Sequence, residues 1–299
     1  MSEAKSVEQL ATLGERVLAD SSHIFEDHDS RRESEELLAL SLRVDDPEDL
    51  DFGYEPPRPM RERFLSFITR RAGGEPLPLI TGRIEFYGLD LKIRPGAFVP
   101  RPSSELTVTR ALKRLRGRRA PVVVDVCSGA GPIALALGDE LPEAEVWGTD
   151  ISDEGLAQAR ANARSLGIGN VTFKNGDMYG SLPDRLRAGV DVITGHVPYV
   201  PFDELDDLPA EVREHEPVYT LSDETDDGLT LMRRAIEEAP EWLKPGGWLL
   251  LEVSDDLTGR LRRMCRGAGL EDKGAITDKD ELSMLVEARK PRSSPTRAR

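Results

Sequence analysis

The sequence predicts an α/β fold, in which a mostly parallel sheet is flanked by helices and preceded by a small helical region. Three observations predict it. Over residues 6–74, apolar residues recur at three- and four-residue spacing. From residue 120 onward, short apolar runs alternate with amphipathic segments, which is typical of a parallel sheet with helices on both faces. Between these parts, residues 84–99 alternate and are split by glycine, which predicts a β-hairpin.

The helical region is expected to hold three helices, at residues 6–19, 30–43 and 60–74. Ser30 is a candidate N-cap of the second helix, and Gly73 and Gly74 end the third. The segment 45–59 contains four prolines and a glycine, so it predicts a loop.

In the second part, the expected strands and helices follow one another in regular order. The strands are residues 121–126, 144–151, 170–177, 190–200 and 246–254, and the helices are residues 131–140, 152–167 and 229–243. We therefore divide the chain into a helical cap domain (1–82), a linking β-hairpin (83–102), an α/β domain (103–290) and a disordered basic tail (291–299).

Composition and charge exclude several classes of protein. The 55 acidic and 40 basic residues give a net charge of −15, so we expect no nucleic-acid partner. No apolar run approaches a membrane span, and the first residues lack the pattern of a signal peptide, so we expect no membrane partner. The two cysteines are far apart and the four histidines show no ligand spacing, which predicts reduced thiols in the cytoplasm and no metal site.

The strongest motif spans residues 124–137, where a strand runs directly into the loop Cys127-Ser128-Gly129-Ala130-Gly131 and then into a helix. Glycine permits positive φ and close approach of a ligand, and the helix N-terminus offers unpaired N–H groups. A dinucleotide-binding loop would carry a third glycine in the spacing G-x-G-x-x-G, which is lacking here. The loop therefore favours methyl transfer over hydride transfer.

Acidic residues stand at three successive strand ends: Asp125, Asp150 and Asp177. Asp150 follows the glycines by about 20 residues, where an acidic residue binds ribose hydroxyls. Asp125 is expected to face the positive end of the ligand. This pattern predicts an adenosyl ligand along the carboxyl edge of the sheet, with Ile151 and Met178 completing its site.

The chain resembles the glutamine-N5 methyltransferases that modify peptide release factors. The resemblance runs from about residue 30 to 290 and rests on several colinear segments: the linker with the P-R-P-x-x-E signature (74–106), the glycine loop, G-D-M-Y-G-S-L (176–182), the segment 216–236 and L-K-P-G-G-W-L-L-L-E-V (243–253). It implies a helical N-terminal domain that helps to shape the acceptor site. It also implies a Rossmann-like class I methyltransferase domain that binds S-adenosyl-L-methionine and releases S-adenosyl-L-homocysteine.

The chain departs from the family at two positions. Cys127 replaces the first loop glycine, and we expect cofactor binding to survive this change. The family motif N-P-P-Y is His196-Val197-Pro198-Tyr199 here. In the family, the asparagine and the carbonyl of the first proline hold the acceptor amide.

The histidine leads us to expect a different acceptor. Neutral histidine can take up a proton near neutral pH, which suits an acceptor that loses one on methylation. We therefore expect a small aromatic or indole-like amine, with His196 as base or orienter and Tyr199 beside it, both also near the cofactor or its methyl group. The residues expected to bind the acceptor are His196, Val197, Pro198, Tyr199, Phe86, Tyr87 and Phe98.

Three alternatives stay open. A release factor would be a protein substrate, with the histidine tolerated. A nucleic-acid adenine methyltransferase would use a related motif, but the charge and the residue at 196 count against it. A non-catalytic cofactor-binding regulator is the last. The segment 203–227 holds eleven carboxylates and one arginine, and it would favour a cationic acceptor if it lines the pocket.

Overall fold

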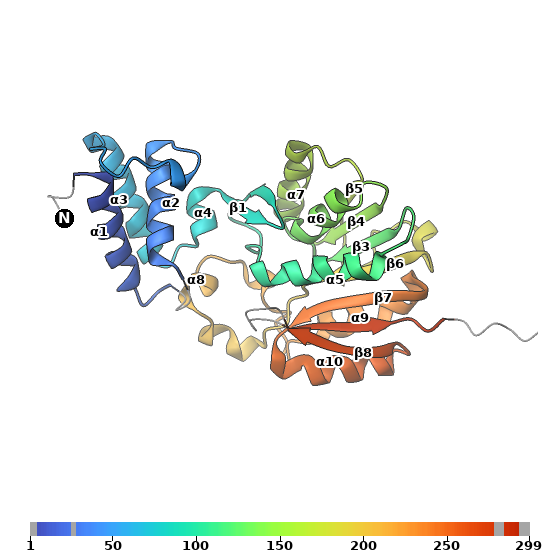
Figure 1. Ribbon diagram of the computed structural model, residues 1–299. Coiled ribbons are helices and arrows are strands. Elements are labelled where there is room, and N and C mark those ends of the chain that lie inside the picture. Colours follow the sequence, from blue (N-terminus) through green and yellow to red (C-terminus); the bar gives the residue numbers. More distant parts are fainter. Residues whose placement is uncertain (1–4, 25–27, 278–283, 293–299) are drawn as a thin grey trace, which may run out of the picture. The chain divides into compact units, whose positions relative to one another are not determined.

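A computed structural model describes residues 5–24, 28–277 and 284–292 (Figure 1). The chain divides into two compact units: Met1–Arg83 with Asp206–Glu216, and Ile84–Leu205 with Pro217–Arg299. Most of the predicted basic tail, residues 293–299, lies outside the described residues. None of the helices in the described ranges is both long and apolar enough to cross a membrane.

The first unit is built from short helices around a small apolar core. They are α1 (Val7–Ala19), α2 (Ser30–Leu42), the 3₁₀ turn η1 (Pro47–Asp49), α3 (Arg58–Ala72), α4 (Leu77–Thr81) and α8 (Ala210–Arg213). Leu10, Leu37 and Phe64 are fully buried in the core that α1, α2 and α3 share. The cap of α2 differs from our prediction: Asp29, not Ser30, accepts the hydrogen bond from the Arg32 amide, because Ser30 is already in the helix.

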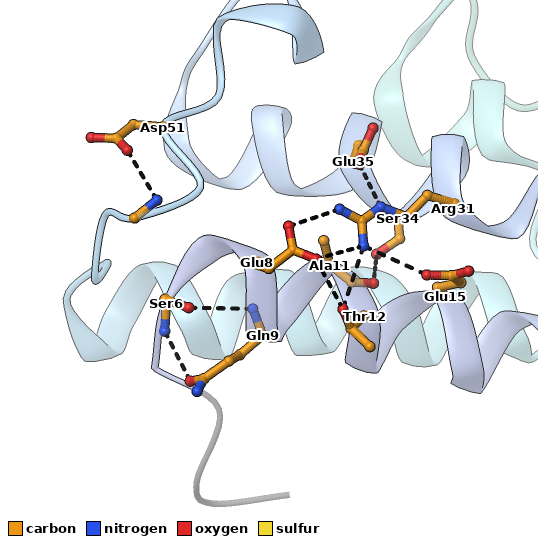
Figure 2. A network of polar contacts seen from close by, with 11 residues as sticks. Ser6, Glu8, Gln9, Ala11, Thr12, Glu15, Arg31, Ser34, Glu35 and Asp51 are labelled. Carbon is orange, nitrogen blue, oxygen red and sulfur yellow. Dashed lines mark hydrogen bonds and ion pairs between the residues drawn. The ribbon is translucent and has the colours of Figure 1, made fainter.

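A polar network joins α1 to α2 in this unit (Figure 2). The guanidinium of Arg31 donates to Glu35 at 2.5 Å and to both carboxylate oxygens of Glu8, at 3.2 and 3.1 Å. At the start of α1, the Ser6 hydroxyl and the Gln9 side chain form a reciprocal capping box. The capping box provides hydrogen-bond partners for backbone amides at the start of α1. The contacts of Arg31 with Glu8 link α2 to α1.

The return of residues 206–216 to the first unit was not predicted. Arg71 contributes to it; this residue is 3% exposed and donates to Glu33 at 2.7 and 2.9 Å. The same guanidinium pairs with Glu211, within α8, at 3.0 Å. Buried charges are usually paired with opposite charges, and here two carboxylates pair with the guanidinium.

The second unit begins at Ile84, within a two-stranded hairpin of β1 (Arg83–Phe86) and β2 (Leu89–Lys92). Tyr87 and Gly88 form its two-residue turn with φ of 51° and 77°, as a type I′ turn requires. The Glu105 carboxylate accepts a hydrogen bond from the Tyr87 amide at 2.7 Å, so the signature glutamate holds the turn.

A seven-stranded sheet forms the body of the second unit, in the order β5-β4-β3-β6-β7-β9-β8. Its strands are β3 (Val122–Val126), β4 (Glu145–Asp150), β5 (Val171–Asn175), β6 (Val190–Gly195), β7 (Leu243–Val253), β8 (Glu271–Thr277) and β9 (Met284–Arg289). The first five pair in parallel, and β9 is antiparallel to both neighbours. The predicted α/β class is thus confirmed, while β8 and β9 were not foreseen.

Helices and short turns complete the unit. They are η2 (Pro102–Ser104), α5 (Glu105–Leu115), α6 (Pro132–Glu140), α7 (Asp153–Leu166), η3 (Asp184–Leu186), η4 (Phe202–Asp207, which continues into the first unit), η5 (Val218–Thr220), α9 (Thr230–Trp242) and α10 (Asp255–Gly267). The apolar side chains of α9 and α10 pack with one face of β3, β6 and β7. Every residue of β6 is buried, as expected for a strand covered on both faces.

The sheet places a ligand edge between β3 and β6. From β3 the chain runs outward through β4 and β5, and it then returns to add β6 on the other side of β3. Crossovers of one hand therefore put helices on opposite faces, and in such sheets ligands bind at the carboxyl ends of the strands where the order reverses, here β3 and β6. The glycine loop and the turn of residues 196–199 both leave the sheet at this edge.

Candidate active site

The glycine loop connects the end of β3 to α6 through backbone conformations that most residues avoid. Cys127, Gly129 and Gly131 have φ of 55°, 53° and 82°. A Cβ on Gly131 would come within 2.7 Å of the Phe173 ring, so both conformation and space require glycine there. Cys127 adopts the left-handed conformation that the family's glycine would adopt more cheaply.

Asp125 lies beneath this loop, not in front of it. It is 1% exposed, and its two oxygens accept hydrogen bonds from the hydroxyls of Ser128 at 2.6 Å and Thr194 at 2.7 Å. Burial raises the pKa of Asp125 to about 7, against the effect of these two hydrogen bonds. We predicted a direct contact with the cofactor, whereas this geometry supports a role in joining the loop to β6.

Asp150 ends β4 beside the loop, as predicted. Its carboxylate accepts from the Gly129 amide at 2.7 Å and from the Ser152 amide at 2.8 Å. A Cβ on Gly129 would meet nothing within 4 Å, so open space adjoins the loop at this carboxylate. Ile151 follows with 57% exposure, an apolar side chain available to a flat ring. A carboxylate that still has acceptor capacity, an open glycine and an exposed isoleucine fit an adenosyl ligand.

Asp177, the third acidic residue, does not lie at the end of a strand as predicted. Strand β5 ends at Asn175, and the Asp177 carboxylate is half exposed and accepts from Arg234 of α9 at 3.1 and 2.9 Å. Met178 has φ of 50° and a side chain buried in the core of the sheet. The side chain of Met178 therefore packs inward, and a role in binding the cofactor would use its backbone.

The turn after β6 presents His196 and Tyr199 together. Their rings stack with centroids 6.0 Å apart and planes 17° apart. Phe98, from the loop after the hairpin, lies edge to face with the His196 ring at a centroid distance of 5.1 Å, and the guanidinium carbon of Arg101 lies over the Phe98 ring, 4.4 Å from its centroid. Burial raises the pKa of Tyr199 to about 12, with the Glu252 carboxylate adding to the shift, so its hydroxyl stays protonated near neutral pH.

Not every residue predicted for the acceptor site turns toward it. Val197 is fully buried in the core, so its side chain cannot bind an acceptor and only its carbonyl is left for that role. Phe86 is 1% exposed within the hairpin, and the Tyr87 hydroxyl accepts from Thr109 of α5 at 3.4 Å. Phe86 therefore packs inside the hairpin, and Tyr87, in its turn, contacts α5. Pro198 is partly buried beside Tyr199.

Two groups near His196 were missed by sequence reasoning. Glu252 of β7 is 2% exposed, and its Oε2 lies 3.6 Å from Nδ1 of His196. The Ser104 hydroxyl lies 3.4 Å from the same nitrogen, and Ser103 donates to Oε1 of Glu252 at 2.9 Å. The two serines belong to the P-R-P-x-x-E signature, and this motif could have indicated that they lie near the site. Their partners, however, lie far away in the sequence.

The part of the acidic segment that belongs to this unit supports the acceptor turn. The amides of Val200 and Phe202 donate to the carbonyls of Leu221 at 3.0 Å and Thr225 at 3.1 Å. Gly228, with φ of 59°, lies so close that an added Cβ would come within 2.7 Å of the Pro201 nitrogen. The turn is therefore clamped by backbone contacts.

Comparisons with known proteins agree with this geometry. The profile of a family described as "Methyltransferase domain" matches residues 119–289. The chain is 35% identical over 262 residues to the release factor glutamine methyltransferase of Geobacter sulfurreducens, covering 87% of this chain and 89% of that one. It is 36% identical over 201 residues to the protein of that name from Streptomyces coelicolor, covering 67% and 70%.

Among solved structures, the T. thermophilus 16S rRNA N2 G1207 methyltransferase, in complex with AdoMet and guanosine, has a similar fold. The TM-score is 0.52 at 19% identity, and the match covers 70% of this chain and 49% of that chain. At this identity the likeness concerns the fold alone.

The relatives overturn our expectation of a small-molecule acceptor, because they are named for a protein acceptor. That expectation gave the single residue His196 more weight than the colinear motifs around it. A neutral imidazole has one donor and one acceptor, which is enough to hold an amide. With its glycine loop, the Asp150 carboxylate beside that loop and these relatives, the chain is an S-adenosylmethionine-dependent methyltransferase and belongs to the release factor glutamine methyltransferase family.

Proposed function

We propose that this chain methylates the side-chain amide of a glutamine in a release factor. The observation that carries the proposal is the similarity to relatives named for this reaction, at 30–38% identity over most of the chain. The acceptor turn supports it too, since His196 and the Val197 carbonyl stand where the family's asparagine and proline carbonyl hold the amide.

The residues divide the work between the two reactants. The cofactor, when bound, supplies an electrophilic methyl group on its sulfonium. Asp150 and the loop of residues 127–131 hold the adenosyl part, and Asp125 holds the loop against β6 through Ser128 and Thr194. Methyl transfer is an in-line displacement, so positioning is the main contribution of the protein.

On the acceptor side, the chain offers a donor or acceptor from His196 and a carbonyl from Val197. Nδ1 of His196 faces Glu252 and Ser104, while Nε2 has no hydrogen-bond partner among the residues that the structure describes. Tyr199 and Phe98 bracket the imidazole with apolar surface. A primary amide could pair with the imidazole and the Val197 carbonyl, and the neutral phenol of Tyr199 adds no charge that would compete for it.

The test uses purified protein, S-adenosylmethionine labelled in the methyl group, and a full-length release factor. Mass spectrometry should find one added methyl group on the glutamine of the Gly-Gly-Gln loop. A release factor with this glutamine replaced by glutamate is the matched acceptor control and should stay unmodified. Failure to methylate the intact release factor by a protein that binds the cofactor would refute the proposal.

A pair of enzyme variants ties the reaction to this site. Asp150→Ala should abolish transfer and weaken cofactor binding, because the carboxylate borders the open space beside Gly129. Asp139→Ala removes an exposed carboxylate near the end of α6 and should leave both unchanged. We also infer that the reaction takes place in the cytoplasm, which agrees with two unpaired cysteines and with a release factor as acceptor.

A further inference from the structure

A buried carboxylate stands directly behind the histidine of the acceptor turn. In the parallel pair of β6 and β7, Gly195 is in register with Leu251, so the next residues come side by side: His196, just after the end of β6, and Glu252, still within β7. Glu252 is 2% exposed, and Ser103 donates to its Oε1 at 2.9 Å. One half of the carboxylate is therefore satisfied.

The other half is not. Within the described part of the chain, Oε2 of Glu252 is buried and has no hydrogen-bond donor. The group that faces it is Nδ1 of His196, at 3.6 Å. A buried carboxylate oxygen without a donor is costly, and this cost falls if Nδ1 carries a proton and moves closer. The Ser104 hydroxyl, 3.4 Å from Nδ1, can accept or donate and is a competing partner.

We propose that Glu252 is a positioning residue for methyl transfer: it keeps the proton of neutral His196 on Nδ1 and so directs the unprotonated Nε2 at the acceptor. The proposal rests on the proposed function for the identity of the acceptor, a primary amide. The paired carboxylate then stabilises the imidazolium that forms when Nε2 takes up a proton, as in other carboxylate–histidine pairs.

The step balances as follows. The amide nitrogen forms a bond to the methyl carbon while the carbon–sulfur bond breaks and its electron pair stays on sulfur. The nitrogen loses one proton, which passes to Nε2 of His196 and from there to solvent. The positive charge on the ring lies 3.6 Å from Oε2 of Glu252. Among the described residues, Arg101 lies over the ring of Phe98, Tyr199 is neutral, and the charge of Asp256 acts on Tyr199 together with that of Glu252.

The direct test is the histidine tautomer, read by ¹⁵N NMR on protein labelled in its histidines. The chain has four histidines, so the spectrum contains four pairs of ring-nitrogen signals. The pair that is missing in His196→Asn belongs to His196. In the free protein at alkaline pH, His196 should carry its proton on Nδ1. In Glu252→Gln this preference should be lost, because a neutral amide can either donate to or accept from Nδ1.

Glu287→Gln is the matched control. Glu287 is also a glutamate 2% exposed, on β9 opposite Leu250 of β7, but its oxygens accept from Arg110 at 2.9 and 2.8 Å. This variant should lose stability and keep the His196 tautomer. Ser104→Ala should keep it as well. A preference that survives Glu252→Gln, or that disappears in Ser104→Ala, would overturn the proposal.

Kinetics provide the second readout. Glu252→Gln should lower kcat for the release factor by about 10²-fold, the lower end of what a general base contributes, with little change in KM. If Glu252→Gln does not fold, Glu252→Asp serves instead, since it keeps the charge but withdraws it by one methylene group. The tautomer is measured on the free protein, so a failure of the proposed function appears in the transfer assay alone and a failure of this inference appears in the spectrum.

Discussion

Replacing Gly228 by alanine should displace the turn that carries His196. The new Cβ would meet the Tyr199 carbonyl oxygen and would lie 2.7 Å from the Pro201 nitrogen and 2.8 Å from the Val200 carbonyl carbon. All three are backbone atoms, so no side chain can rotate away. The turn itself must move, and with it the stacked rings of His196 and Tyr199.

Two contributions add to the cost. A non-glycine residue at φ of 59° costs about 1–2 kcal/mol, and the steric conflict costs about 1–3 kcal/mol, as overpacking usually does. A displacement of about 1 Å in reacting groups lowers rates by about 10²-fold. We therefore expect methyl transfer to the release factor to fall by about that factor while cofactor binding is kept.

Gly269→Ala separates the two contributions. Gly269 has φ of 79°, but a Cβ there would meet nothing within 4 Å, so that variant carries the conformational cost alone. The assays are initial rates of transfer, calorimetric binding of S-adenosylmethionine and thermal unfolding, where each kcal/mol shifts Tm by about 2–4 °C for a domain of this size. Equal transfer rates in the two variants would refute the reasoning.

Three further predictions concern the loop, its support and the first unit. Cys127→Val should weaken cofactor binding about tenfold, because a β-branched residue is strained at φ of 55°. Cys127→Gly should bind the cofactor as well as the parent does. Equal calorimetric affinities of the two variants would count against this prediction. The pKa of Asp125, about 7 in the fold, exceeds that of an unfolded aspartate, so stability should fall as pH rises from about 4 to 7, by at most roughly 1.4 kcal/mol per pH unit. Urea unfolding should show this slope in the parent and not in Asp125→Asn. Gly14→Ala should cost about 1–3 kcal/mol, since the Cβ would clash with the Ser34 hydroxyl and lie 2.9 Å from Phe64 and Ile68; a denaturation midpoint like that of the parent would contradict the packing.

The position of the glycine loop and of Asp150 beside it was predictable from local pattern. A strand, a glycine loop and a helix occur together in residues 124–137, and Asp150 follows at the next strand end. Such signals need no knowledge of long-range packing, because consecutive parallel strands end at one edge of the sheet. Asp177 shows the limit of this argument: it lies two residues past the end of β5, where Arg234 of α9 pairs with it.

The acceptor half depends on contacts that sequence spacing does not reveal. Ser104 and His196 are 92 residues apart, and Glu252 meets Ser103 from 149 residues away. Their meeting requires the order β3-β6-β7 and the register that sets Gly195 against Leu251. Val197 was assigned to the acceptor because its neighbours are, yet the turn directs its side chain into the core. The return of residues 206–216 to the first unit likewise involves a contact between residues far apart in sequence, the ion pair of Arg71 with Glu211.

The exchange of asparagine for histidine at position 196 changes less than it first suggests. An asparagine side chain offers a donor on one side and an acceptor on the other. A neutral imidazole with its proton on Nδ1 offers the same two functions, with the donor toward Glu252 and the acceptor toward the substrate. What it adds is the capacity to take up a proton, and the buried carboxylate supplies the counter-charge. A substituted residue in an acceptor turn is therefore weak evidence for a new acceptor unless the groups behind it have changed as well.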